Sequence, residues 1–251
     1  MGNDNQTDPA QIARHVQQSL PADGLFAGHQ WRVATRPFPL DKKTVKQLEK
    51  LGRMLLKFYQ ATNMIYRWSA EGRLPAWPAE WLDRGKPQSI IDLQRHKAFR
   101  PDLPRVIRPD ILLTEDGLKI TELDSVPGGI GLTAWLNRTY AEAGTEVLGS
   151  TTGMLDGFAG IFGDAKQIRL IVSEESATYR PEMEWLAGQI APGRMSVHGQ
   201  EFNNFTEGDA GYRFFELFDQ PNIPAADNYS NAPPTRRSRS PLRRSRSSRR
   251  K

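Results

Sequence analysis

Apolar positions follow a helical period in the first part of the chain and a strand-like period further on. From Asp41 to about Ala70 they recur every three or four residues, which predicts a long amphipathic helix capped by Asp41. We expect its apolar and aromatic stripe to pack into the core rather than to bind a cofactor. Asp8 and Pro9 open a shorter helix that ends before Pro21. The same criteria predict helical segments near residues 79–82, 90–99, 132–144 and 151–163.

A β-hairpin is predicted in the middle of the chain. Two strand-like runs, Val106 to Leu113 and Leu118 to Leu123, flank the turn sequence Glu115-Asp116-Gly117. A three-residue loop with glycine in the left-handed conformation is a common connection between antiparallel strands. The two runs are therefore expected to pair with each other across this turn.

The register expected for this hairpin brings three acidic side chains onto one face. Leu112 should lie opposite Ile120, and Asp110 opposite Glu122. Because side chains alternate between the two faces of a strand, Asp124 shares the face of Glu122. Close carboxylates repel one another unless a cation compensates them, and Mg²⁺ prefers oxygen ligands of this kind. The sequence therefore predicts a magnesium site formed by Asp110, Glu122 and Asp124.

A glycine-containing turn follows the acidic residues directly. Pro127 to Gly131 precedes the helix-like segment 132–144, and its glycines allow backbone N–H groups to approach a ligand. The N-terminus of a helix favours negative charge. Gly128 and Gly129 are thus candidates for binding a phosphate or a substrate.

Residues 166–199 have the pattern of a βαβ unit. Apolar strand-like segments at 167–176 and 194–199 enclose a helical segment at 181–190. We therefore predict an α/β (α+β) fold: an N-terminal helical region, the hairpin with its magnesium site, and a Rossmann-like βαβ unit. Polar residues 173–176 would lie at the carboxyl end of the first strand, where open α/β sheets bind ligands, but no phosphate-binding glycine motif accompanies them.

Composition limits the kinds of chemistry available. The chain has 251 residues, 38% of them apolar, and no cysteine, which excludes disulfides, thiolate metal sites and a cysteine nucleophile. No apolar run is long enough to span a membrane and no signal-peptide pattern is present, so we expect a cytoplasmic protein without membrane contact. The net charge of +5 is unevenly distributed. Arg236 to Lys251 carries nine basic and no acidic residues, which leaves 25 basic and 29 acidic residues elsewhere.

The central stretch resembles a known enzyme signature. Arg108-x-Asp110, the hairpin, Glu122-x-Asp124 and then Pro127-Gly128 are similar to the R-x-D, E-x-N and P-G motifs of ATP-grasp ligases. The resemblance implies that Asp110, Glu122 and Asp124 bind Mg²⁺ on ATP. It also implies that Arg108 neutralises the transferring phosphoryl group and that Gly128 helps to bind an acyl phosphate. Asp124 stands where the family usually has asparagine, which adds one negative charge.

The early position of this signature is similar to the circularly permuted ATP-grasp group, which includes glutathionylspermidine synthase-like ligases. The activity implied is ATP-dependent joining of a small-molecule carboxylate to an amine, with ATP and Mg²⁺ as cofactors. Only residues 132–227 follow the hairpin before the composition changes, and no second lobe with ATP-binding lysines is recognisable there. We therefore expect this chain to bind ATP weakly or not at all, as a truncated or inactive fragment would.

The tail from residue 228 onward is expected to be disordered, because it is of low complexity and cannot bury apolar area. One interpretation is functional: arginine–serine segments contact RNA phosphates, so Arg236–Lys251 would bind nucleic acid nonspecifically. This makes an RNA-interacting protein the alternative function. The other interpretation is a frameshift, because a back-translation of residues 228–235 shifted by one inserted base reads as an ordinary amphipathic helix. The expected organisation is 1–40, 41–150, 151–227 and the tail 228–251.

Overall fold

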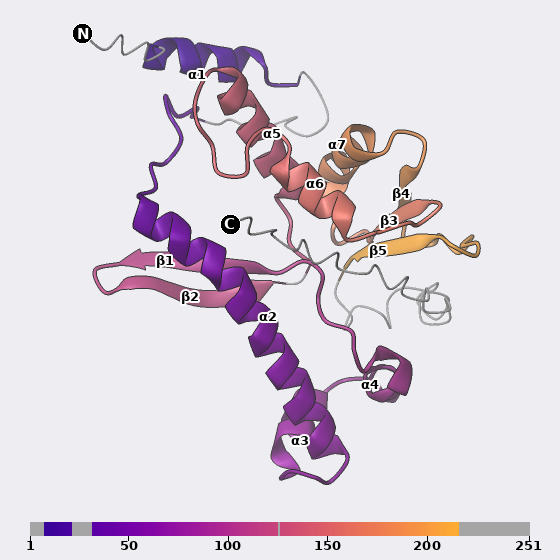
Figure 1. Ribbon diagram of the computed structural model, residues 1–251. Helices are drawn as coiled ribbons and strands as arrows, with labels where there is room; N and C mark the ends of the chain where they lie inside the picture. The colour runs from indigo at the N-terminus through magenta and orange to yellow at the C-terminus, as the bar shows by residue number, and fades with distance from the viewer. Residues whose placement is uncertain (1–7, 22–31, 125, 216–251) are drawn as a thin grey trace, which may run out of the picture.

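The computed structural model describes residues 8–21, 32–124 and 126–215. It is a mixed α/β structure, as the sequence predicts. Figure 1 shows a body of helices around a small sheet, with the long helix α2 running past the hairpin toward α3 and α4. The helices are α1 (Pro9–Gln18), α2 (Lys42–Ala70), α3 (Trp77–Asp83), α4 (Gln88–Arg95), α5 (Ile130–Glu142), α6 (Gly153–Gly160) and α7 (Arg180–Ile190). The strands are β1 (Arg108–Thr114), β2 (Gly117–Asp124), β3 (Ile168–Val172), β4 (Met195–Gly199) and β5 (Ala210–Phe214).

The βαβ unit predicted for residues 166–199 is confirmed. Strands β3 and β4 are parallel, in the register Ile168 opposite Met195, and α7 connects them. A third strand, β5, pairs in parallel with the other side of β3, so the sheet order is β4-β3-β5. The sequence reasoning did not identify β5. Its segment has only five residues, too few for an alternating pattern to be distinct, although Gly208 and Asp209 form a turn signal directly before it.

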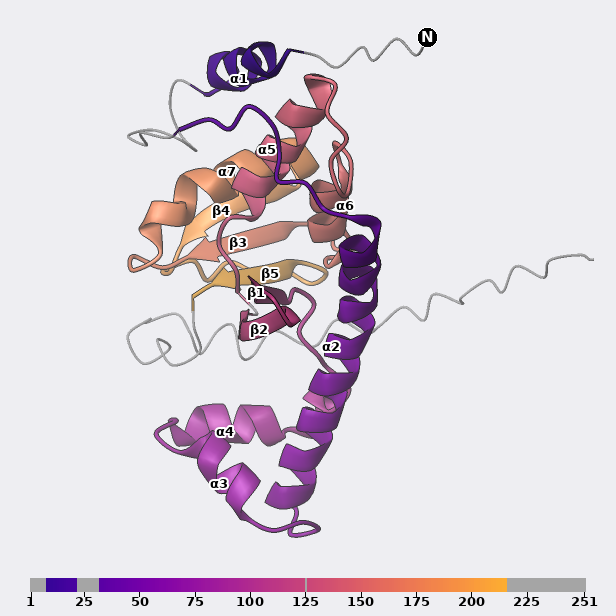
Figure 2. The same ribbon diagram turned by 90° about the vertical axis from the view of Figure 1, so that its left-hand side faces the viewer.

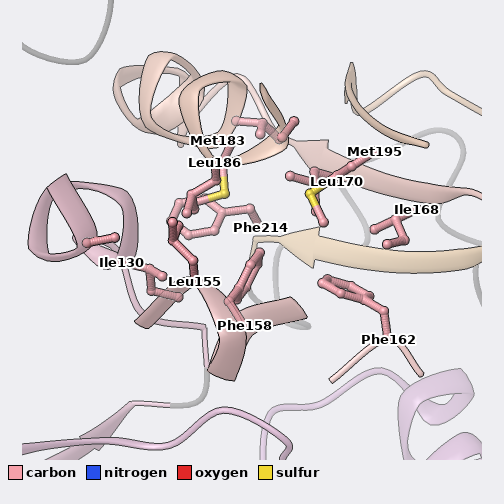
Figure 3. Packing of buried hydrophobic residues seen from close by; sticks show 13 residues of the cluster. Ile130, Leu155, Phe158, Phe162, Ile168, Leu170, Met183, Leu186, Met195 and Phe214 are labelled. Atoms are coloured by element: carbon pink, nitrogen blue, oxygen red, sulfur yellow. The ribbon is translucent and has the colours of Figure 1, made fainter. Parts of the chain in front are cut away.

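The main core lies between this sheet and the helices α5, α6 and α7. Ile168, Leu170 and Val172 point to the same face of β3 and are almost completely buried, because side chains of a strand alternate between its faces. Figure 3 shows Ile168 and Leu170 in the same cluster as Met183 and Leu186 of α7. The aromatic rings of the core contact one another edge to face. These pairs are Phe158 with Phe162 at 5.3 Å and Phe158 with Tyr212 at 5.1 Å between ring centroids.

The connection from β4 to β5 covers part of the opposite face of the sheet. Phe202 and Phe205 of this connection pack against Ile171, which points away from the main core. Arg169 points to this face too, where its Nε atom lies 3.4 Å from Asp209 Oδ2 and its NH1 group donates to Ser196 Oγ. The β3 strand is thus covered on both faces, which explains why its sequence is almost continuously apolar.

The N-caps predicted at Asp8 and Asp41 are confirmed. Asp8 accepts the N–H of Ala10, with Pro9 at the first position of α1. Asp41 accepts the N–H of Thr44 at 2.6 Å, and α2 then continues to Ala70, where the sequence pattern predicts its end. The buried residues Ile12 and Val16 attach α1 to Trp135 and Tyr140 of α5.

The environment of α2 differs from the prediction. Within the described part of the chain, only Leu55, Tyr66, Arg67 and Ser69 of this helix are buried. Phe58 is 54% exposed and Met54 is 64% exposed, so much of the apolar stripe does not lie in the core. Figure 2 shows α2 standing at the side of the molecule and contacting the body along only part of its length. An amphipathic pattern identifies the apolar side of a helix but not the surface that covers it.

None of the helices in the described ranges is both long and apolar enough to cross a membrane.

Candidate functional site

The hairpin forms, and its acidic end has the expected pairing. Asp110 lies opposite Glu122, and Arg108 lies opposite Asp124. Near the turn the prediction is wrong by one residue, because Thr114 pairs with Gly117. The turn therefore has two residues between the paired ends rather than three, and Gly117 has a positive φ of 101°.

A β-bulge reconciles the shorter turn with the expected pairing of the acids. The register shifts between Asp110 and Ile111, so that Thr121 is the extra residue of β2. Consequently Ile120 lies opposite Ile111. The sequence had predicted that it would lie opposite Leu112, and this prediction is wrong. The Thr121 hydroxyl donates to the Asp110 carbonyl at 3.3 Å. The bulge moves Glu122 back into line with Asp110.

Arg108 is the centre of the polar contacts at this end of the hairpin. Its Nε donates to Asp110 Oδ1 at 3.2 Å, and its NH2 lies 3.2 Å from Asp124 Oδ2. Its NH1 donates to the carbonyl oxygen of Gly128 at 3.0 Å. One guanidinium therefore connects both strands to the glycine turn. All of these groups are partly solvated, so each ion pair alone stabilises the fold by at most about 1 kcal/mol.

The acidic residues are arranged around Arg108 and not around one shared point. Asp124 uses its second oxygen to accept the N–H of Val126 at 2.8 Å, which orients the carboxylate toward the turn. Across the described ranges, no three histidine or acidic side chains are grouped so that they could hold a metal ion together. Asp110 and Glu122 remain as a cross-strand pair of carboxylates beside the arginine.

At the start of α5, where the sequence predicts an anion-binding turn, a side chain of the protein accepts the exposed N–H groups. Glu182 of α7 accepts the N–H of Gly129 at 3.1 Å and that of Gly131 at 3.2 Å. Gly129 adopts the left-handed conformation, with φ 82°, at the cap position of the helix. Burial raises the pKa of Glu182, while the N–H groups of residues 129–131 act in the opposite direction. The positive end of the helix is thus compensated from within the chain.

The glycines of the turn also permit close packing. A Cβ atom on Gly128 would lie 2.4 Å from the ring of Tyr179, and one on Gly131 would lie 2.6 Å from Glu182 Cγ. Tyr179 in turn contacts Phe214 at the end of β5, with 5.1 Å between ring centroids. The glycine turn is therefore attached to the carboxyl end of the parallel sheet, where the βαβ topology favours ligand binding.

A cavity of about 810 Å³ lies between α2, α4 and β5. Its volume is within the range typical of small-molecule pockets. Burial raises the pKa of Tyr59 on its wall, and the negative charge of Asp124 raises it further.

Sequence reasoning missed Glu182 and Tyr179, which come to the glycine turn from the βαβ unit. Both contacts join segments about 50 residues apart, and neither residue belongs to a motif. The residues of the expected RNA-binding tail, Arg236–Lys251, lie outside the described residues, as do 228–235. No protein-family model, curated protein or solved structure matches this chain.

Proposed function

We propose that this chain carries the magnesium- and phosphate-binding hairpin of an ATP-grasp-type ligase, which joins a small-molecule carboxylate to an amine at the expense of ATP. The observation that supports this proposal most is the pairing of Arg108 with Asp124 and of Asp110 with Glu122, with Arg108 bonded to the Gly128 carbonyl. Five positions of the motif that are spread over 21 residues of sequence meet at one end of a hairpin.

The carboxylates fit Mg²⁺ in one particular way. Mg²⁺ usually takes one or two protein carboxylates and completes its shell with water and substrate phosphates. Asp110 and Glu122 face each other across the strands and could provide such a pair. A direct site with three carboxylates does not fit, because Asp124 is bonded to Arg108 and to the Val126 N–H. Bound Mg²⁺ would supply positive charge for the phosphates of ATP.

Arg108 has the chemistry required beside a transferring phosphoryl group. Its planar guanidinium offers several N–H donors, and it is permanently charged. Its contacts with Asp110 and Asp124 hold it at the hairpin end, where about half of its side chain is shielded from water. We propose that the arginine turns from these carboxylates to a phosphate when a nucleotide binds. Such positioning of charge is the main means by which proteins promote phosphoryl transfer.

Glu182 limits what the glycine turn can bind. The N–H groups of Gly129 and Gly131 already donate to its carboxylate. A phosphate or acyl phosphate at the start of α5 would therefore have to replace Glu182. Together with the extra negative charge of Asp124, this competition leads us to expect weak binding of Mg·ATP.

Isothermal titration with Mg²⁺ and ATP tests the proposal. We expect binding that requires both components, with a dissociation constant in the millimolar range. Asp110→Asn and Glu122→Gln should each weaken it by about tenfold, as expected for the loss of one interaction with a charged group. Glu115→Gln is the matched control, because this residue lies in the hairpin turn away from the acidic end.

Two outcomes would contradict the proposal. Binding of ATP that is the same with and without Mg²⁺ would exclude the hairpin as a metal site. Equal effects of Glu115→Gln and Glu122→Gln would show that general charge, and not the Asp110–Glu122 pair, determines the affinity. Micromolar affinity would support the site but refute the expected competition by Glu182.

A further inference from the structure

The cavity between α2, α4 and β5 has a lining that combines aromatic rings with positive charge. Tyr59 and Tyr66 come from α2, Phe99 follows α4, and Phe215 follows β5. The charged residues on its wall are three cations and one acid: Arg67, Lys86, Arg213 and Asp102. An aromatic lining with an excess of positive charge favours a ring-bearing ligand that is negatively charged.

Arg67 is the most informative residue of this wall. Arg67 is only 8% exposed. No carboxylate of the described ranges forms an ion pair with its guanidinium. Its guanidinium donates instead to Asn63 Oδ1 and to the carbonyl oxygens of Gln94 and Arg95. These carbonyls form the C-terminal end of α4, which carries only about half a negative charge. A partly uncompensated positive charge thus lies beside the cavity.

The contacts of Arg67 also fix its position before any ligand arrives. Three hydrogen bonds hold the guanidinium, so a ligand would not have to order a flexible side chain. Tyr59 adds a polar group, since its hydroxyl has no hydrogen-bond partner among the residues that the structure describes. Tyr66 differs from it, because its hydroxyl donates to Asp83 Oδ1 at 2.8 Å. The cavity therefore offers a fixed cation and a hydroxyl donor.

We propose that this cavity binds a small organic anion with an aromatic body, whose negative group lies near Arg67 and whose ring lies among Tyr59, Phe99 and Phe215. This site goes beyond the hairpin and does not depend on magnesium there. Arg213 of β5 provides a second positive charge in the lining, where its NH1 group donates to the carbonyl oxygen of Phe215. An anion between Arg67 and Arg213 would connect the α2–α4 region with the edge of the parallel sheet.

A pair of fluorescent probes with the same ring system tests the charge requirement. Dansylglycine carries a carboxylate, whereas dansylamide is neutral, and both change their emission in an apolar environment. We expect the full chain to bind dansylglycine about tenfold more tightly than dansylamide, the factor expected for one interaction with a charged group. Equal affinities for the two probes, or no binding of either one, would overturn the proposal.

Variants locate the site. Arg67→Met and Arg213→Met should each remove most of the preference for dansylglycine, while Arg53→Met should not, because Arg53 lies exposed on α2 outside the cavity. Should Arg67→Met fail to fold, Arg213→Met decides alone. An unchanged preference in Arg213→Met would overturn the proposal.

Competition identifies the negative group. Benzoate and phenyl phosphate are tested as competitors of dansylglycine, with benzyl alcohol as the neutral control. Displacement of dansylglycine by either anion, at concentrations where benzyl alcohol has no effect, supports the proposal. The anion that competes more strongly shows whether the cavity prefers a carboxylate or a phosphate. Equal displacement by benzyl alcohol would overturn it. The measurements are made without Mg²⁺ and ATP, so their result is independent of the hairpin site.

Discussion

Glu182 Oε1 accepts the N–H of Gly131 at 3.2 Å, and the two residues belong to different helices that are 51 positions apart in sequence. The second oxygen of the same carboxylate accepts the N–H of Gly129. An acidic side chain at the N-terminus of a helix stabilises it through the exposed N–H groups and the helix dipole. This contact joins the hairpin half of the chain to the βαβ half.

The close approach of Gly131 to α7 predicts the effect of adding one methyl group. A Cβ atom there would lie 2.6 Å from Glu182 Cγ and 3.1 Å from the Glu182 carbonyl oxygen. We expect Gly131→Ala to lower the free energy of unfolding by about 1–3 kcal/mol, the usual cost of overpacking. The control is Gly157→Ala on the exposed side of α6, where no atom lies within 4 Å. Urea denaturation should show this second change to be stabilising by about 0.5–1 kcal/mol.

Glu182 should also make the stability depend on pH. Burial raises its pKa in the folded protein above the ordinary value of 4.5. A carboxyl group with a raised folded pKa contributes stability that is present below the unfolded pKa and is lost as the pH rises through the folded pKa. The free energy of unfolding of the wild-type protein should therefore fall relative to that of Glu182→Gln as the pH increases from the ordinary value upward.

Urea denaturation of both proteins over a series of pH values measures this difference. Glu184→Gln on the same helix controls for the loss of one negative charge, because its side chain is 57% exposed. Parallel curves for wild type and Glu182→Gln would contradict the expected effect of burial.

A comparison of two tyrosines of α2 measures how much one hydrogen bond contributes to the free energy of unfolding. Tyr66 donates to Asp83, which also forms an ion pair with Arg95 at 2.5 Å. Tyr66→Phe should lower the free energy of unfolding by about 1 kcal/mol, because it leaves part of this network without a donor. Tyr59→Phe removes a hydroxyl without such a bond in the described structure and should have a much smaller effect. Similar losses in both variants would refute this account of the network.

The different surroundings of two phenylalanines predict a large contrast. Phe158 is 3% exposed in the main core, whereas Phe58 on α2 is 54% exposed. Phe158→Ala should cost about 3–5 kcal/mol of stability, as expected for a cavity in a packed core. Phe58→Ala should change it by no more than about 0.5 kcal/mol. A large loss in Phe58→Ala, measured by thermal or urea unfolding, would show that α2 is covered in solution.

Local signals in the sequence were sufficient for much of the fold. Asp8 and Asp41 mark the starts of their helices because a carboxylate can accept N–H groups that lack a partner within the helix. The hairpin was predicted from two strand-like runs on either side of a turn that contains glycine. The βαβ unit was predicted from apolar runs on either side of a helical pattern. Each of these features depends on residues that are close together in sequence.

The remaining features depend on contacts between distant segments. The carboxylate of Glu182 fills the cradle that the glycine turn offers, yet nothing in the segment around Glu182 indicates that partner. The apolar stripe of α2 was expected to be buried, but periodicity does not reveal how far a helix extends beyond the body. Likewise the pairing of Asp110 with Glu122 was predicted through the wrong turn, and it holds because a bulge at Thr121 offsets the error.

Because of that bulge, the strand register near the turn differs by one residue from the register at the acidic end of the hairpin. Changes in the length of the turn would alter which residues meet near the tip, where Leu113 pairs with Leu118. The extra residue at Thr121 absorbs one step of mismatch before the strands reach their acidic end. If the ladder continued without a bulge past Ile111, Asp110 would pair with Thr121, and Glu122 and Asp124 would lie on the face of the ribbon opposite to Arg108. The bulge thus works as a spacer that sets the side on which the hairpin presents its charges.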